Sequence, residues 1–106
     1  MKIKMFTVFD SKVGAYLQPF FMQSTGAAMR AFEDSCNDPQ MQFNKHPADF
    51  TLFEIGEYDD SDASVILLEN KISLVSALEC LAVKESSPVP LSVAKNNNVV
   101  SKEAIQ

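Results

Sequence analysis

Few residues in this chain could carry out chemistry, and none of them stands in a catalytic pattern. His46 is the one histidine, so a Ser-His-Asp or Cys-His arrangement would have to use it. It lies in Lys45-His46-Pro47-Ala48-Asp49 with no nucleophile motif nearby, which favours a structural role in a turn. Nucleotide-binding loops need closely spaced glycines, and the three glycines here are Gly14, Gly26 and Gly56. We therefore predict that the protein is not an enzyme.

Metal-binding patterns are equally weak. Cys36 and Cys80 have no CxxC partner, so we expect two free thiols in a reducing cytoplasm rather than a disulfide or a zinc site. Asp59-Asp60-Ser61-Asp62 resembles the start of a calcium loop. However, Ser64 and Asn70 stand where an EF-hand needs glycine and glutamate, which favours a solvated hairpin turn. We expect neither a metal nor a cofactor.

Charge is distributed unevenly along the 106 residues. Nine basic and fourteen acidic side chains give a net charge of −5, which does not favour a polyanionic partner. Lys2, Lys4 and Lys12 nevertheless cluster near the amino end, whereas the stretch from 49 to 69 contains acids and no base. Neighbouring strands carrying these segments would attract each other, or each segment could meet a different partner. The acids predicted to meet a basic protein are Glu54, Glu57, Asp59, Asp60 and Asp62.

Basic and aromatic side chains occur together in the first part of the chain. Proteins that bind single-stranded nucleic acid combine cations for phosphates with exposed aromatic rings for bases. The predicted nucleic-acid contacts are Lys2, Lys4, Lys12, Tyr16, Arg30 and Lys45. Alternatively, the aromatic rings belong to the core and the lysines protect a solvated sheet edge. The net negative charge favours this alternative when the residues are considered alone.

The local patterns predict two β-hairpins, each followed by a helix. The first hairpin joins strands Ile3–Asp10 and Ala15–Phe21, and Pro19 marks an edge or a bulge. Ser24 or Thr25 caps a helix that runs to about Cys36. After a long loop over 40–50, the remaining elements are strands Thr51–Tyr58 and Ala63–Glu69 and a helix over Lys71–Val83 with Leu74, Leu78 and Leu81 on one stripe.

These elements define the fold class α+β: a small antiparallel sheet of two β-hairpins, with one or two helices on one face, in the order ββαββα. Residues 1–83 form the predicted single domain, and 84–106 a flexible tail. The uncovered sheet face would be free to meet a partner or a second copy, so we expect a homo-oligomer, specifically a homodimer. No apolar stretch is long enough to cross a membrane.

Six short blocks, taken in order, resemble a known family. The match covers about residues 5 to 68 and lies in 6–12, 16–21, 25–32, 37–39, 46–50 and 52–60. In this order and spacing, the blocks resemble the small nonstructural protein of gokushoviruses, single-stranded DNA phages of the Microviridae.

The resemblance implies a nonstructural DNA-binding protein that acts in single-stranded viral DNA synthesis and in genome packaging into procapsids. It further implies the cytoplasm of the infected bacterial host rather than the virion. The implied partners are single-stranded viral DNA, the phage replication initiator or host replication proteins, and the procapsid. The family supplies no catalytic or DNA-contact residue that could be transferred. One alternative is a dimeric adaptor or assembly factor without direct DNA contact, and another is an inhibitor whose acids mimic DNA.

Overall fold

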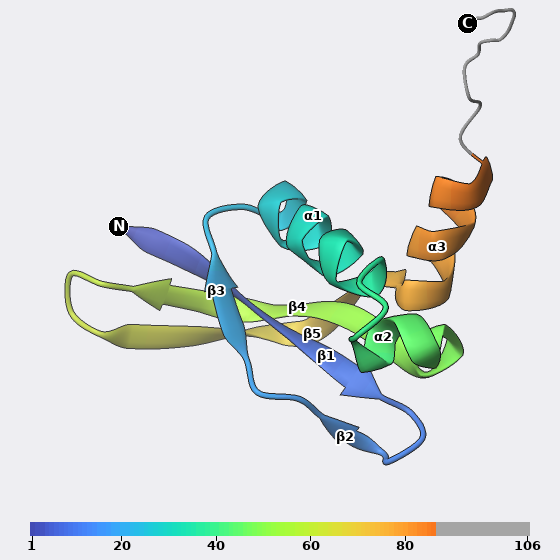
Figure 1. The fold of residues 1–106 in the computed structure, drawn as a ribbon. Coiled ribbons are helices and arrows are strands. Elements are labelled where there is room, and N and C mark those ends of the chain that lie inside the picture. The colour runs from blue at the N-terminus through green and yellow to red at the C-terminus, as the bar shows by residue number, and fades with distance from the viewer. Residues whose placement is uncertain (87–106) are drawn as a thin grey trace, which may run out of the picture.

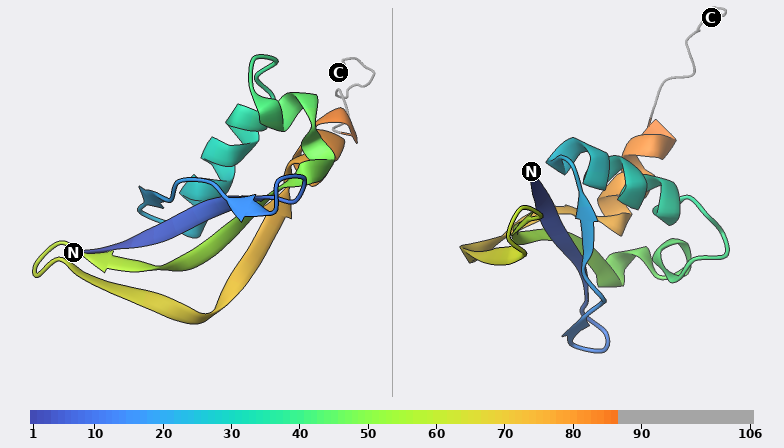
Figure 2. Two further views of the ribbon diagram at one scale, coloured as in Figure 1. Left: turned by 90° about the horizontal axis from the view of Figure 1, so that it is seen from below. Right: turned by 90° about the vertical axis from the view of Figure 1, so that its left-hand side faces the viewer.

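One curled antiparallel sheet, with helices on one face, forms the part of the chain that the structure describes, residues 1–86 of a computed structural model (Figure 1, Figure 2). The predicted α+β fold class is therefore confirmed. No helix within these residues is both long and apolar enough to span a membrane. The elements in chain order are β1 (Lys2–Asp10), β2 (Ala15–Tyr16), β3 (Phe20–Met22), α1 (Thr25–Cys36), α2 (Gln42–Lys45), the 3-10 helix η1 (Pro47–Asp49), β4 (Phe50–Asp59), β5 (Ser64–Ser76) and α3 (Ala77–Ser86).

The sheet places the basic and the acidic segments side by side. Its strand order is β2-β1-β4-β5, and β3 also pairs with β1. β1 and β4 are antiparallel, with Lys2 opposite Asp59 and Lys4 opposite Glu57. The lysines of β1 therefore lie beside the acids of β4, the arrangement in which the two segments attract each other.

Helix α1 forms where the sequence predicts it. The Ser24 side chain accepts a hydrogen bond from the Ala27 backbone N–H at 3.1 Å, which satisfies one of the free amides of the first turn. The helix turns one face toward the sheet, as its apolar spacing requires. The resulting core contains Phe6, Val8, Ala28, Phe32, Cys36, Phe50, Leu52, Ala77 and Cys80.

The return strand of the first hairpin and the segment before β4 each correct a prediction. Ala15–Phe21 is not one strand, because the chain leaves the sheet between β2 and β3 around Pro19, which has no N–H to donate. The predicted loop over 40–50 contains α2 and η1. Phe43 on α2 packs between Phe32 and Phe50, with ring centroids 5.2 and 4.9 Å apart, and this contact orders the segment.

The predicted helix over Lys71–Val83 begins too early. Residues 71–76 continue strand β5, and α3 starts at Ala77 and runs to Ser86, past the predicted domain boundary at Val83. A capping box fixes this start: Ser76 N–H donates to Glu79 Oε1 at 2.8 Å, and Glu79 N–H donates to Ser76 Oγ at 3.1 Å. Of the predicted tail, residues 87–106 lie outside the described part of the chain.

The two cysteines meet in the core between α1 and α3. Both are buried and free, and burial raises the pKa of Cys36 from its ordinary value of 9.0 to about 12. The pKa of Cys80 is raised in the same direction, chiefly by burial. Each thiol therefore stays neutral in the folded protein at pH values that ionise it in the unfolded chain.

We expect the protein to lose stability in alkaline solution for this reason. Because the pKa of Cys36 is raised in the folded state, its contribution to stability is fully present below the unfolded-state pKa of 9.0. This contribution is lost as the pH rises toward the folded-state pKa of about 12, because the thiol then ionises in the unfolded chain first. The loss from Cys36 is at most about 1.4 kcal/mol per pH unit. Urea unfolding at pH 8, 9 and 10 checks this, and Cys36→Ala should show a shallower dependence. An equal slope in the variant would contradict the assignment.

Candidate nucleic-acid interface

The face of the sheet opposite the helices carries an aromatic cluster. Side chains alternate along β1, so Phe6 and Val8 pack under the helices while Thr7 and Phe9 project from the other face. Tyr16 pairs with Phe9 across the first hairpin, with ring centroids 4.7 Å apart, and its ring meets Phe53 edge-on at 5.8 Å. The left view of Figure 2 shows that no helix covers this face. The sheet thus presents aromatic rings on its open side.

Tyr16 combines exposure with a neighbouring cation. Its side chain is 45% exposed, and Lys71 Nζ from β5 lies 5.7 Å from the centre of its ring. Thr7 Oγ1 donates to the Leu17 carbonyl oxygen at 2.7 Å, which fixes the chain next to Tyr16. We call the depression around Tyr16 and Lys71 the open-face groove. It is lined by Thr7, Tyr16, Leu17, Pro19, Ile55, Leu67, Leu68 and Lys71.

The groove has the chemistry to hold a nucleobase beside a phosphate. A flat base can stack on an exposed tyrosine ring, and such stacking tolerates any base because every base has a π-face. A lysine above the ring adds a cation that can contact the neighbouring phosphate. The remaining lining is largely apolar, which favours the base over water.

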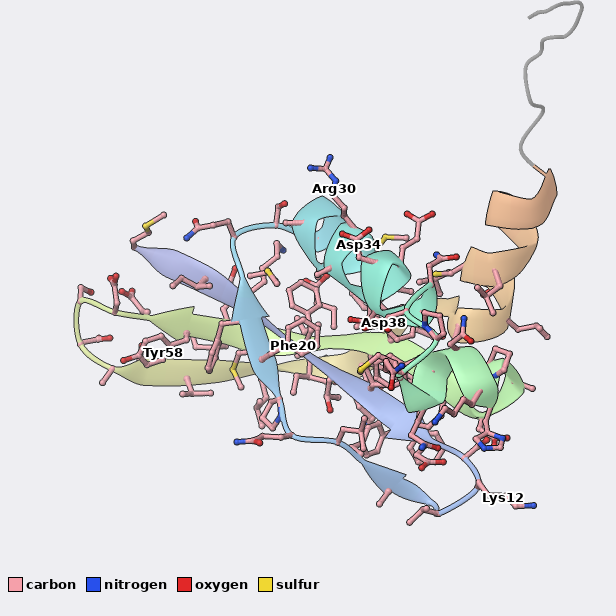
Figure 3. All side chains as sticks on the ribbon, viewed as in Figure 1. Lys12, Phe20, Arg30, Asp34, Asp38 and Tyr58 are labelled. Carbon is pink, nitrogen blue, oxygen red and sulfur yellow. The ribbon has the colours of Figure 1, made fainter. Side chains whose placement is uncertain are left out.

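The six predicted nucleic-acid contacts do not form one surface. Tyr16 lies in the groove and Lys12 in the turn of the same hairpin, both exposed. Figure 3 shows Arg30 on α1, pointing away from the sheet and far from Lys12. Lys45 is exposed on α2, and Lys2 is exposed beside Asp59 at the start of β1.

Lys4 forms an ion pair with an acid of the same chain. Its Nζ lies 3.1 Å from Glu54 Oε2, and Thr25 Oγ1 donates to Glu54 Oε1 at 2.9 Å. Glu54 is only 7% exposed. Lys4 is thus paired with an acid of the same chain, and Glu54 is buried within that pair, so neither side chain stands free on the surface as its predicted role would require. Together with Thr25 they tie β1, β4 and the start of α1.

The other acids lie toward the β4–β5 turn. Glu57 is half-buried on β4, while Asp60 and Asp62 are exposed in the turn. Hydrogen bonds from the Ser61 side chain and backbone lower the pKa of Asp59, and hydrogen bonds from Ser64 lower that of Asp62. Within residues 1–86, no three His, Cys, Asp or Glu side chains are placed to hold a metal ion.

Lys71 is a groove residue that the sequence patterns do not indicate. They predict a helix from this residue, whereas the bend of β5 brings Lys71 over Tyr16 from the other edge of the sheet. The local sequence carries no signal for this contact, because strand pairing between distant segments creates it.

The fold and the groove describe a small sheet protein with one open aromatic face, and sequence comparison gives its family. The chain matches the family described as Phage ORF5 protein over residues 3–80 and belongs to it. It is therefore a bacteriophage protein. No curated protein and no solved structure matches it.

Proposed function

We propose that this phage protein binds single-stranded DNA through the open-face groove. The observation that carries the proposal is the pair of Tyr16 and Lys71, an exposed ring with a cation 5.7 Å above it. Lys12, in the turn of the same hairpin, is a further exposed cation. This pairing of cations with an exposed ring is typical of proteins that bind single strands without reading sequence.

The charge of the chain limits how such binding works. A protein with net charge −5 cannot neutralise a long stretch of phosphates, so stacking rather than counterion release must supply much of the affinity. A DNA-condensing or coat role is therefore disfavoured. Weak and short-lived binding suits a protein that contacts the single strand between its synthesis and its packaging.

We infer a place for this activity from the resemblance to gokushovirus nonstructural proteins. The protein would act in the cytoplasm of the infected bacterium, in single-stranded viral DNA synthesis and in packaging into procapsids, and would not enter the virion. The exposed acid Asp62 is the candidate for contact with a basic partner such as the replication initiator or a host replication protein, because Asp60 already pairs with the Met1 ammonium at 2.6 Å. No step of this function requires catalysis by the chain.

The test is fluorescence anisotropy with labelled single-stranded and double-stranded oligonucleotides over a salt series. We expect preference for the single strand, and Tyr16→Ala should weaken binding about tenfold or more because a stacked base is lost. Lys71→Ala should lower the slope of log K against log salt by about 0.7, the value for one phosphate contact on a single strand.

Arg30→Ala is the matched control, since it removes one exposed charge from the face that carries the helices. It should leave the affinity for DNA nearly unchanged. If folded protein does not bind at low salt, or if Tyr16→Ala binds as the wild type does, the proposal is wrong and a protein-interaction adaptor becomes the better hypothesis.

A further inference from the structure

The outer edge of β5 is long, apolar and unpaired within residues 1–86. β5 is the last strand of the sheet, and no described strand pairs with its far side. The side chains of Val65, Ile66, Leu67 and Ile72 are between 46% and 66% exposed. Natural sheet proteins normally shorten, charge or cover such an edge, because it offers a free row of backbone donors and acceptors.

The sequence of this strand is close to a palindrome centred on Asn70. Glu69 and Lys71 flank the centre with opposite charges, and apolar residues follow on both sides. The residues equidistant from Asn70 are Leu68 with Ile72, Ile66 with Leu74, Val65 with Val75 and Ser64 with Ser76. Leu67 with Ser73 is the one equidistant pair that matches an apolar residue with a polar one. An antiparallel copy aligned on Asn70 would therefore meet residues of matching chemistry.

The bend of β5 lies close to the same point, between Glu69 and Asn70. Gly56 pairs with Leu67 and Glu54 pairs with Ile72, so residues 68–71 bulge out of the ladder with β4. Figure 2, left, shows the strand bending sharply at this point into two arms. A two-fold axis through the bend and normal to the sheet exchanges the arms. The β5 strands of two copies paired this way would therefore bend in the same direction and would stay side by side along both arms.

We propose that a second copy of this chain pairs with β5 in antiparallel fashion about a two-fold axis at Asn70. Glu69 of each copy then lies opposite Lys71 of the other, and Asn70, whose amide both donates and accepts, faces itself. The exposed apolar side chains of Val65, Ile66, Leu67 and Ile72 then gain neighbours from the second copy, and the two sheets become one. An isologous contact of this kind closes after two chains, so the edge is removed rather than extended.

A second copy fits this edge better than a strand from another protein. Opposite charges placed symmetrically about the centre are matched automatically when the strand meets itself. An unrelated strand could cover the apolar arms, but nothing would select this charge order or this position of the bend.

The test is sedimentation of the full chain over a concentration series without DNA. We expect a reversible dimer, and Glu69→Lys should raise its dissociation constant at least about tenfold because it sets two lysines opposite each other twice. Lys71→Glu should do the same. Exchanging both, Glu69→Lys with Lys71→Glu, restores opposite charges and should return the constant to within about threefold of the wild type.

Asp62→Lys is the matched control, since it makes the same charge change in the β4–β5 turn and should not affect the dimer. If a charge variant does not fold by circular dichroism, Asn70→Asp tests the same axis by setting two carboxylates face to face. A wild type that stays monomeric, or a dimer that the double exchange does not rescue, overturns the proposal. Because no DNA is present, this result does not depend on DNA binding, and Glu69→Lys tests the dimer without changing Lys71 of the open-face groove.

Discussion

Gly56→Ala is expected to lower the free energy of unfolding by about 1 to 3 kcal/mol, the usual cost of overpacking a filled site. A Cβ at this position would lie 2.5 Å from the Ile66 carbonyl oxygen and 3.1 Å from Leu67 Cα. Both are backbone atoms, so no side chain can rotate away, and β5 would have to move off β4. Urea unfolding followed by circular dichroism measures the change.

Gly26→Ala is the control for this substitution. Gly26 lies in the first turns of α1, and nothing stands within 4 Å of the position that its Cβ would occupy. Alanine is the better helix former, so this variant should be as stable as the wild type or more stable by up to about 1 kcal/mol. Equal stability of both variants would show that β5 does not approach β4 as closely as described.

The parts of the fold that depend on local signals could be predicted from the sequence. Alternation of residue types identified β1, and Ser24 identified the start of α1, because a strand period and a helix cap act within a few residues. The helices were correctly expected on one face, since α1 has an apolar stripe that must be buried.

The end of β5 could not be assigned in this way. Glu69-Asn70-Lys71 has the polarity of a loop, and leucines at 74, 78 and 81 have helical spacing, so a helix from Lys71 was the natural interpretation. Pairing with β4 keeps residues 72–76 extended instead. The signal that was available is Ser76-x-x-Glu79, whose reciprocal hydrogen bonds mark the true helix start.

The candidate site could be predicted only in part, because contacts between distant strands create some of it. Tyr16 could be selected because it lies near lysines in the sequence, whereas the exposure of its ring is seen only in the structure. Its neighbour Lys71 could not, since the contact depends on a bend in a distant strand. Lys4 and Glu54 were assigned to two different partners, whereas the pairing of β1 with β4 makes them partners of each other.

Lys4→Met is expected to destabilise the fold by about 1 to 3 kcal/mol, because it leaves the buried Glu54 carboxylate with Thr25 as its remaining side-chain partner. Glu54→Leu should cost less, since the Lys4 side chain is about a third exposed and its ammonium can reach water. The double variant should recover part of the loss, because two apolar side chains replace the pair without leaving a buried charge. Urea unfolding of all four proteins gives the coupling energy.

Lys2→Met separates this effect from a general loss of positive charge. Lys2 is exposed on the same strand, so its replacement should change stability by no more than about 0.5 kcal/mol. Lys4→Met should also leave the affinity for single-stranded DNA unchanged in protein that remains folded, whereas Lys71→Ala should reduce it. Equal stability of the Lys2 and Lys4 variants would show that Lys4 does not link β1, β4 and α1. A loss of DNA binding by folded Lys4→Met would return Lys4 to the nucleic-acid interface.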